Sequence, residues 1–241
     1  MKPRKKLYEF HTANLRAVSA ALDRVAASTR TAIASNVPPE IETFTRLYAM
    51  LLGAWAECRL AKLLYHPNAY NDADCQTVRN QSTHLDRWHK VVELAFRKHY
   101  IIPHAALSEN TLTHSAYSRY RTISTLLNGE LHFVITLRNK LAHGQWIYPL
   151  NDQWDDVAQV QMDALRTENL LSLKFKKVIL DALLNAIADL ALSLPTFDRD
   201  FDNHYRQIQN AQRDLRTRSF ADYSASLQSK YQRGRAKRAA P

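Results

Sequence analysis

The feature that most constrains the fold is the scarcity of chain-breaking residues between long stretches of helical hydrophobic periodicity. Only 4 of the 241 residues are glycine and 8 are proline, whereas strand-rich folds need frequent turns. From residue 5 to about 35, apolar residues recur at alternating spacings of three and four, a pattern typical of a helix packed along a partner helix. The sequence therefore predicts an all-α fold.

Prolines and clusters of Asn and Asp divide the chain into helical segments. The predicted helices cover residues 5–35, 40–65, 82–100, 113–143 with a bend at Asn128-Gly129, 167–195 and 196–218. We expect one helical bundle over 1–195 and a C-terminal helical extension, 196–231, that packs on it. The last segment, 232–241, places basic residues among Gly and Ala, which predicts a basic disordered tail.

One segment breaks the helical pattern directly after the helix that ends at 143. Residues 145–148 and 158–162 are short and partly alternating, and a polar stretch separates them. This pattern predicts a small β-hairpin insertion at 145–163.

The charge and the cysteines limit the partners and the compartment. The formal net charge of +10 indicates an acidic partner, for which RNA, DNA or a membrane surface qualifies. The most apolar run, 178–194, carries three polar residues at intervals of four, so we expect a core helix and no membrane span. Cys58 and Cys75 show no metal-ligand spacing, which indicates free thiols in a reducing, cytoplasmic compartment.

A functional site is indicated where the fourth predicted helix ends. Residues 138–143 read R-N-K-L-A-H and Gly144 follows. Arg138 falls on the apolar row of the helix, while Asn139 and His143 are four apart and share an adjoining face. Gly144 suits a left-handed helix cap, which places His143 in the last turn. A phosphodiester fits these side chains, because Arg can bind its oxygens and His can transfer its protons.

The spacing by itself is not specific, because Arg-x4-His occurs three times in the chain. The segment 79–84 is polar throughout and is expected to form a loop or a first helical turn. The segment 199–204 is acidic, so its Arg has carboxylates as neighbours. Only the segment 138–143 follows an apolar helical run and ends in a glycine.

Residues 137–144, L-R-N-K-L-A-H-G, resemble the signature of the HEPN superfamily. The resemblance implies a HEPN-like helical bundle and metal-independent endoribonuclease activity, with two protomers pairing so that both motifs line one composite cleft. Arg138 and His143 would then be catalytic and Asn139 would support them. One toxin-family variant has Tyr two residues after the His, and Gln145 does not match it.

The same resemblance indicates partners and a biological setting. Many HEPN members act in toxin–antitoxin or anti-phage defence systems, so we expect RNA as substrate, a homodimer, and an antitoxin or an activating partner. No cofactor or metal is expected, since Asp152, Asp155 and Asp156 lie in a predicted loop where they cap or solvate the chain.

Further residues are candidates for RNA binding. Lys140, Arg213 and Arg216 offer cations to phosphates, and the Trp146 ring can stack on a base. Packing under the hairpin is the competing interpretation for Trp146, and a solvated helix end is the one for Arg213 and Arg216.

Two alternatives to catalysis stay open. Arg138 could have a structural role by pairing with a core carboxylate, for which Glu57 on the second helix is the candidate. The protein as a whole could be a non-catalytic RNA- or nucleotide-binding module of HEPN-like fold, or a helical adaptor in a larger complex.

Overall fold

The computed structural model describes residues 3–239, and within this range the chain is helical and forms no strand. The predicted all-α class is therefore confirmed. The helices are α1 (Arg4–Ser35), α2 (Pro38–Leu64), α3 (Asp72–Arg79), α4 (His84–Tyr100), α5 (His114–Leu126), α6 (His132–Ala142), α7 (Gln159–Thr167), α8 (Leu170–Leu192), α9 (Leu194–Thr217) and α10 (Phe220–Ala239).

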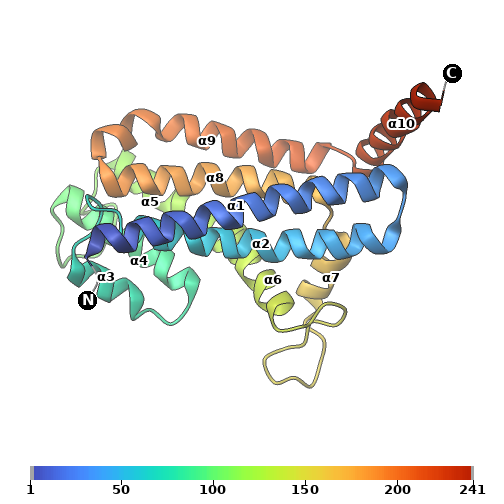
Figure 1. The fold of residues 1–241 in the computed structure, drawn as a ribbon. Coiled ribbons are helices and arrows are strands. Elements are labelled where there is room, and N and C mark those ends of the chain that lie inside the picture. The colour runs from blue at the N-terminus through green and yellow to red at the C-terminus, as the bar shows by residue number, and fades with distance from the viewer. Residues whose placement is uncertain (1–2, 240–241) are drawn as a thin grey trace.

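Two antiparallel helix pairs, α1 with α2 and α8 with α9, form the body of the molecule (Figure 1). The first pair is joined by a turn that the sequence predicts well. Asn36 ends α1 in the left-handed conformation with φ 54°, and the backbone N–H of Val37 donates to the carbonyl of Ala32 at 3.0 Å. Pro38 then begins α2, where its missing N–H costs nothing.

The second pair shows that α9 belongs to the bundle. Ser193 ends α8, and its side chain accepts a hydrogen bond from the Thr196 N–H to cap α9. The apolar face of α9 buries Phe197, Phe201 and Ile208. The segment 196–231 thus contains one bundle helix and most of a second helix, α10.

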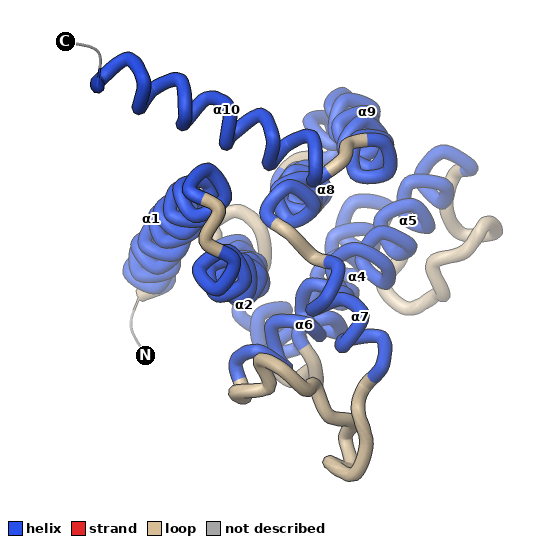
Figure 2. The backbone as a smooth tube through the Cα atoms, turned by 90° about the vertical axis from the view of Figure 1, so that its right-hand side faces the viewer, coloured by secondary structure: helices blue, strands red, loops and turns tan. Residues whose placement is uncertain are grey.

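The predicted disorder of the tail is corrected for the described residues. Residues 232–239 continue α10 as a helix, which projects away from the bundle (Figures 1 and 2). Ala, Arg, Lys and Gln favour helix, and Lys237 and Arg238 stand in the last turn, where the helix dipole favours cations. Residues 240–241 lie outside the described range.

The predicted β-hairpin at 145–163 is also corrected. Its only β feature in the described chain is an isolated bridge between Leu150 and Val157, and its second predicted strand is the start of α7. A short apolar run does not distinguish a strand from a helix. Packing fits the helix, because Met162 is buried and Leu165, three residues further on, packs against the core, whereas Val160 is 70% exposed.

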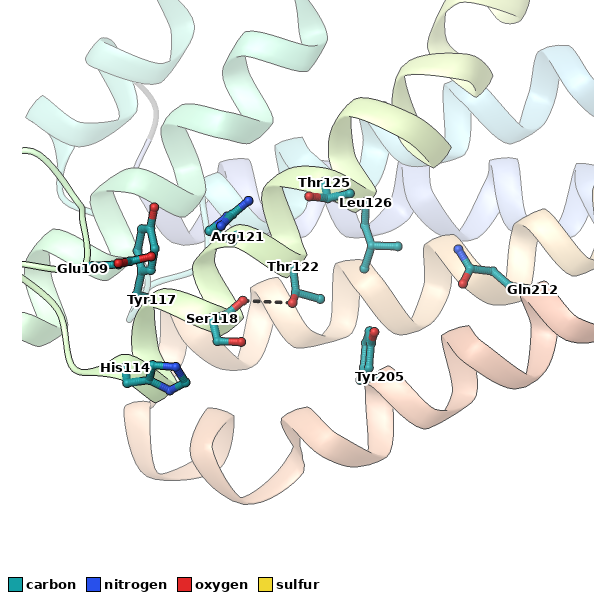
Figure 3. A pocket seen from close by; sticks show the side chains of 10 residues that line it. All are labelled: Glu109, His114, Tyr117, Ser118, Arg121, Thr122, Thr125, Leu126, Tyr205 and Gln212. Atoms are coloured by element: carbon teal, nitrogen blue, oxygen red, sulfur yellow. Dashed lines mark hydrogen bonds between the residues drawn. The ribbon is translucent and has the colours of Figure 1, made fainter.

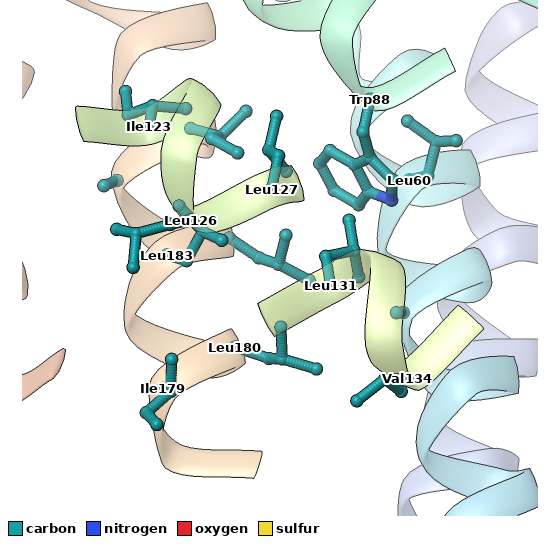
Figure 4. Close-up of a cluster of buried hydrophobic side chains, with 14 of the residues drawn as sticks. Leu60, Trp88, Ile123, Leu126, Leu127, Leu131, Val134, Ile179, Leu180 and Leu183 are labelled. Carbon is teal, nitrogen blue, oxygen red and sulfur yellow. The ribbon is translucent and has the colours of Figure 1, made fainter. Parts of the chain in front are cut away.

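The predicted bend at Asn128-Gly129 is confirmed as a π-helical turn, Leu127–Leu131, between α5 and α6. Leu127 and Leu131 are fully buried and pack near Trp88 of α4 and Leu180 of α8 (Figure 4). The extra residue of a π turn changes the direction in which the following helix presents its faces. This turn therefore sets how α6, which carries the motif, meets α2.

The short helix α3 was not predicted from the sequence. Asn71 and Asp74 form a capping box at its start, so the polar stretch that ends α2 also begins a new helix.

Along residues 3–239 the structure has no helix with the length and hydrophobicity that crossing a membrane requires.

Candidate functional site

Arg138 lies where α6 crosses α2 at Gly53. A Cβ added at Gly53 would stand 2.4 Å from Arg138 Cβ and 2.7 Å from Arg138 Cγ. Glycine in a helix interior costs roughly 1 kcal/mol relative to alanine. At Gly53 the missing side chain offsets this cost, because it lets α2 and α6 approach closely. Arg138 therefore lies on the apolar row of α6, as predicted, and that row faces α2.

The Arg138 guanidinium is held by two neighbours. Its Nη2 donates to Glu57 Oε2 at 2.6 Å, and its Nη1 donates to Asn139 Oδ1 at 3.0 Å. The Arg138 side chain is 26% exposed and that of Glu57 is 19% exposed. The sequence-based expectation that Glu57 could pair with Arg138 is confirmed, and Asn139 supports the same guanidinium.

His84 joins this group from the start of α4. Its Nε2 lies 3.3 Å from Glu57 Oε1, so Glu57 stands between His84 and Arg138. Burial lowers the pKa of His84 below its ordinary value of 6.5, and the attraction of Glu57 opposes this shift while Arg87 and Arg138 add to it. A neutral His84 is therefore favoured near pH 7.

His84 was missed as a site residue, although the chain contained a signal. It ends the polar segment 79–84, the other R-N-x-x-x-H sequence. Arg79 of that segment is exposed at the end of α3, so only the histidine joins the cluster. Gly53 was also missed, although an isolated glycine inside an apolar helical pattern often marks a close helix contact.

His143 occupies the exposed C-terminal end of α6. Gly144 has φ 77°, the Gln145 N–H donates to the Lys140 carbonyl at 3.0 Å, and the Gly144 N–H donates to the Leu141 carbonyl at 3.1 Å. This is the Schellman motif, and it confirms the predicted glycine cap. Among residues 3–239, no side chain or backbone group pairs with the His143 ring.

Arg138 and His143 therefore differ in environment. They are five positions apart, roughly 7.5 Å along the helix axis. Arg138 is half-buried and oriented, whereas His143 is free at the surface. The chain alone presents one oriented cation and one unpaired, exposed imidazole at the same end of a helix.

Two of the predicted RNA-binding residues have structural partners. Lys140 Nζ donates to the Leu150 carbonyl at 2.5 Å and holds the loop that follows the motif. Trp146 Nε1 donates to the Leu141 carbonyl at 2.9 Å, and its ring packs against the core. The packing interpretation of Trp146 is the one that the structure favours.

Arg213 and Arg216 lie away from the motif. They follow Gln212 in α9, and Gln212 Nε2 donates to Glu130 Oε1 at 2.8 Å. Glu130 lies in the turn before α6, about 20 Å along the helix from His143. Arg213 and Arg216 are exposed, but they do not belong to the same site.

The loop beside His143 exposes large side chains. Ile147, Tyr148 and Trp154 are 62%, 63% and 69% exposed, and Trp154 has φ 63°. A bulky residue in the left-handed region is strained, and such strain is often found at functional sites.

The described chain contains no cluster of metal-binding side chains. Along residues 3–239, no group of three or more His, Cys, Asp or Glu side chains is placed to hold a metal ion. Cys58 and Cys75 are free thiols. Burial raises the pKa of Cys58, and the Glu57 carboxylate adds to this shift.

A polar pocket of about 480 Å³ lies between α5 and α9, apart from the motif. Arg121 and His114 line it together with Tyr117 and Tyr205 (Figure 3). Within α5 the lining extends as far as Leu126, and no residue of the segment 138–143 lines the pocket.

Comparisons with known proteins assign the chain to no family. No protein-family model matches the chain, and no match to a curated protein or to a solved structure was found.

Proposed function

We propose that the protein is a metal-independent endoribonuclease of the HEPN type that cuts RNA in a cleft between two copies of the chain. The observation that carries the proposal is the end of α6, where an oriented guanidinium, Arg138, and an unpaired imidazole, His143, lie on one helix. The resemblance of residues 137–144 to the HEPN signature and the all-α fold support it.

The chemistry needs both kinds of side chain. The RNA 2′-oxygen attacks the adjacent phosphorus while a base takes its proton, and the bond from phosphorus to the 5′-oxygen breaks as an acid protonates that oxygen. The products are a 2′,3′-cyclic phosphate and a 5′-hydroxyl. Arg138 stabilises the charge on the phosphorane, using guanidinium donors that Glu57 and Asn139 leave free.

The dimer follows from the proton transfers. One His143 cannot accept the 2′-hydroxyl proton and donate a proton to the leaving oxygen at the same moment. Two copies bring two His143 rings to one cleft, one as base and one as acid. The exposed end of α6 is accessible for such pairing.

The biological role extends the proposal. A nuclease of this type acts as a prokaryotic toxin or an anti-phage defence effector in the cytoplasm. Unrestrained RNA cleavage would harm the host cell, so an antitoxin or an activating partner controls it.

Cleavage in EDTA tests the proposal. Purified protein cuts single-stranded RNA to 2′,3′-cyclic phosphate ends, and His143→Ala or Arg138→Ala lowers the rate at least about 100-fold. The matched controls are His132→Ala, an exposed histidine on the same helix, and Arg199→Ala, the arginine of the third Arg-x4-His segment; both retain activity. A wild-type protein that leaves RNA intact, with and without candidate activators, contradicts the catalytic proposal.

One contact favours a second candidate function. The 2.6 Å bond from Arg138 to Glu57 partly neutralises the guanidinium and leaves it less able to stabilise a phosphorane, which suits a module that binds RNA through its other cations without cutting it. That function predicts RNA binding that weakens with salt, survives His143→Ala and produces no cleavage in any condition.

A further inference from the structure

The second half of α10 carries unpaired positive charge. Lys230, Arg233, Arg235, Lys237 and Arg238 are all exposed. Their side-chain contacts within residues 3–239 are local: Arg235 lies over the Tyr231 ring at 6.0 Å, and Arg238 Nε donates to the Gly234 carbonyl at 3.2 Å. No carboxylate in the described chain pairs with any of these five side chains.

The first half of the same helix is anchored. Phe220, Tyr223 and Leu227 pack against the core cluster, and Gln228 Nε2 donates to the Ile33 carbonyl at 3.4 Å. The cationic half therefore extends from a fixed base, and Figures 1 and 2 show it directed away from the bundle. We name residues 230–238 the basic arm.

The cations of the basic arm are distributed along a helix. Lys230, Arg233 and Lys237 follow each other at spacings of three and four, so they form one stripe, while Arg235 and Arg238 form a second. Their spacing along the axis is about 4 to 6 Å within each stripe. Such a rod presents charge to a flexible anionic chain from more than one side.

The composition of the basic arm separates nucleic acid from membrane. A helix that lies in a membrane surface needs an apolar face with large side chains. Between residues 232 and 238 the other residues are Gln, Gly and Ala, so the arm has no such face. Tyr231 adds a ring on which a base can stack.

We propose that the basic arm is a second RNA-binding site, which holds the phosphate backbone of the RNA that the motif end of the molecule processes. In both views α10 and α6 lie on opposite sides of the bundle (Figures 1 and 2). The arm therefore contacts a part of the RNA distant from the scissile bond. The inference depends on the proposed function only in naming RNA as the polyanion.

The test measures binding of a fluorescent single-stranded RNA in EDTA by full-length His143→Ala protein, over 50 to 200 mM salt. The arm variant changes Lys230, Arg233, Arg235, Lys237 and Arg238 to Gln. Each lost phosphate contact on a single strand lowers the slope of log K against log salt by about 0.7, so five lost contacts remove about 3.5. Over this salt range the affinity of the arm variant then changes about 100-fold less than that of the parent.

A matched variant removes the same charge elsewhere. It changes five exposed cations on other helices to Gln: Lys5, Arg16, Arg24, Arg79 and Arg166. We expect its slope to stay near that of the parent, and circular dichroism checks that both variants keep their helices. Equal slopes for the two variants overturn the proposal, because net charge alone would then explain binding.

Two further outcomes are informative. If anionic phospholipid vesicles bind the parent but not the arm variant, while the RNA slope is the same in both, the arm is a membrane contact and the proposal fails. If wild-type protein cuts no RNA but the arm variant loses the slope, the ribonuclease proposal fails and the RNA-binding arm stands.

Discussion

Arg79–His84 and Arg138–His143 both read R-N-x-x-x-H. The second lies on one continuous helix with its histidine at the cap, whereas the first is divided, with Arg79 at the end of α3 and His84 at the start of α4. Equal spacing in sequence gives equal geometry only where the backbone is continuous. The structure then joins the two segments in an unexpected way, since His84 and Arg138 contact the two oxygens of Glu57.

The two segments differ in the contacts that their side chains make with the rest of the molecule. Its arginine is pressed against α2 at Gly53, and its charge is compensated by Glu57. The first segment supplies only a neutral histidine to that arrangement. Substitutions that remove these contacts one at a time measure how much each contact contributes to the free energy of unfolding.

The largest expected effect comes from Gly53→Ala. The new Cβ would stand 2.4 Å from Arg138 Cβ, so one helix must shift, and overpacking of this kind costs about 2 kcal/mol of unfolding free energy. Urea unfolding measures it. Gly129→Ala is the matched control, because nothing lies within 4 Å of that Cβ, and it should cost nothing. Equal stability of the two variants contradicts the close approach of α2 and α6.

A smaller effect is expected from Glu57→Gln. The variant leaves the half-buried Arg138 without its charge partner, and partial exposure limits the loss to about 1–2 kcal/mol. The control is Glu9→Gln, which removes the exposed pair of Lys6 with Glu9 and should cost less than about 0.5 kcal/mol. Thermal and urea unfolding compare the two, and a Glu57 variant as stable as the Glu9 variant means that the pair contributes little.

The smallest effect concerns the pH dependence of His84. Because burial lowers its pKa in the folded protein, the unfolded chain binds the proton first. The stability contributed by neutral His84 is complete above its ordinary pKa of 6.5 and is lost as the pH falls below that value. We expect His84→Gln to flatten the dependence of unfolding free energy on pH below 6.5, and the exposed His132→Gln to leave it unchanged. Parallel curves for the two variants contradict this role of His84.

Much of the fold could be predicted because it depends on local signals. The turn at Asn36-Val37-Pro38 and the cap at Gly144 each follow from the backbone preferences of one or two residues. The β-hairpin predicted for the segment 145–163 was wrong for the opposite reason. Its residues carry no strong local preference, so the packing of Met162 and Leu165, three residues apart, against the rest of the molecule decided for a helix.

The candidate site divides in the same way. The sequence places Arg138 on the apolar row and His143 at the helix end, because both follow from the period of one helix. Lys140 and Trp146 could not be assigned, since nothing in the sequence indicates that the Leu150 and Leu141 carbonyls are their partners. The contact of His84 with Glu57 is likewise a contact between distant segments.

The sequence by itself determined the helical class, the helix ends that carry a cap or a proline, and the order of polar groups along α6, because each depends on neighbours within a turn or two. Only the tertiary structure decided which carboxylate compensates Arg138, that Gly53 is the point of contact, and that α9 is a bundle helix. These outcomes depend on which helix faces cross, and that is set by the burial of the whole apolar surface at once.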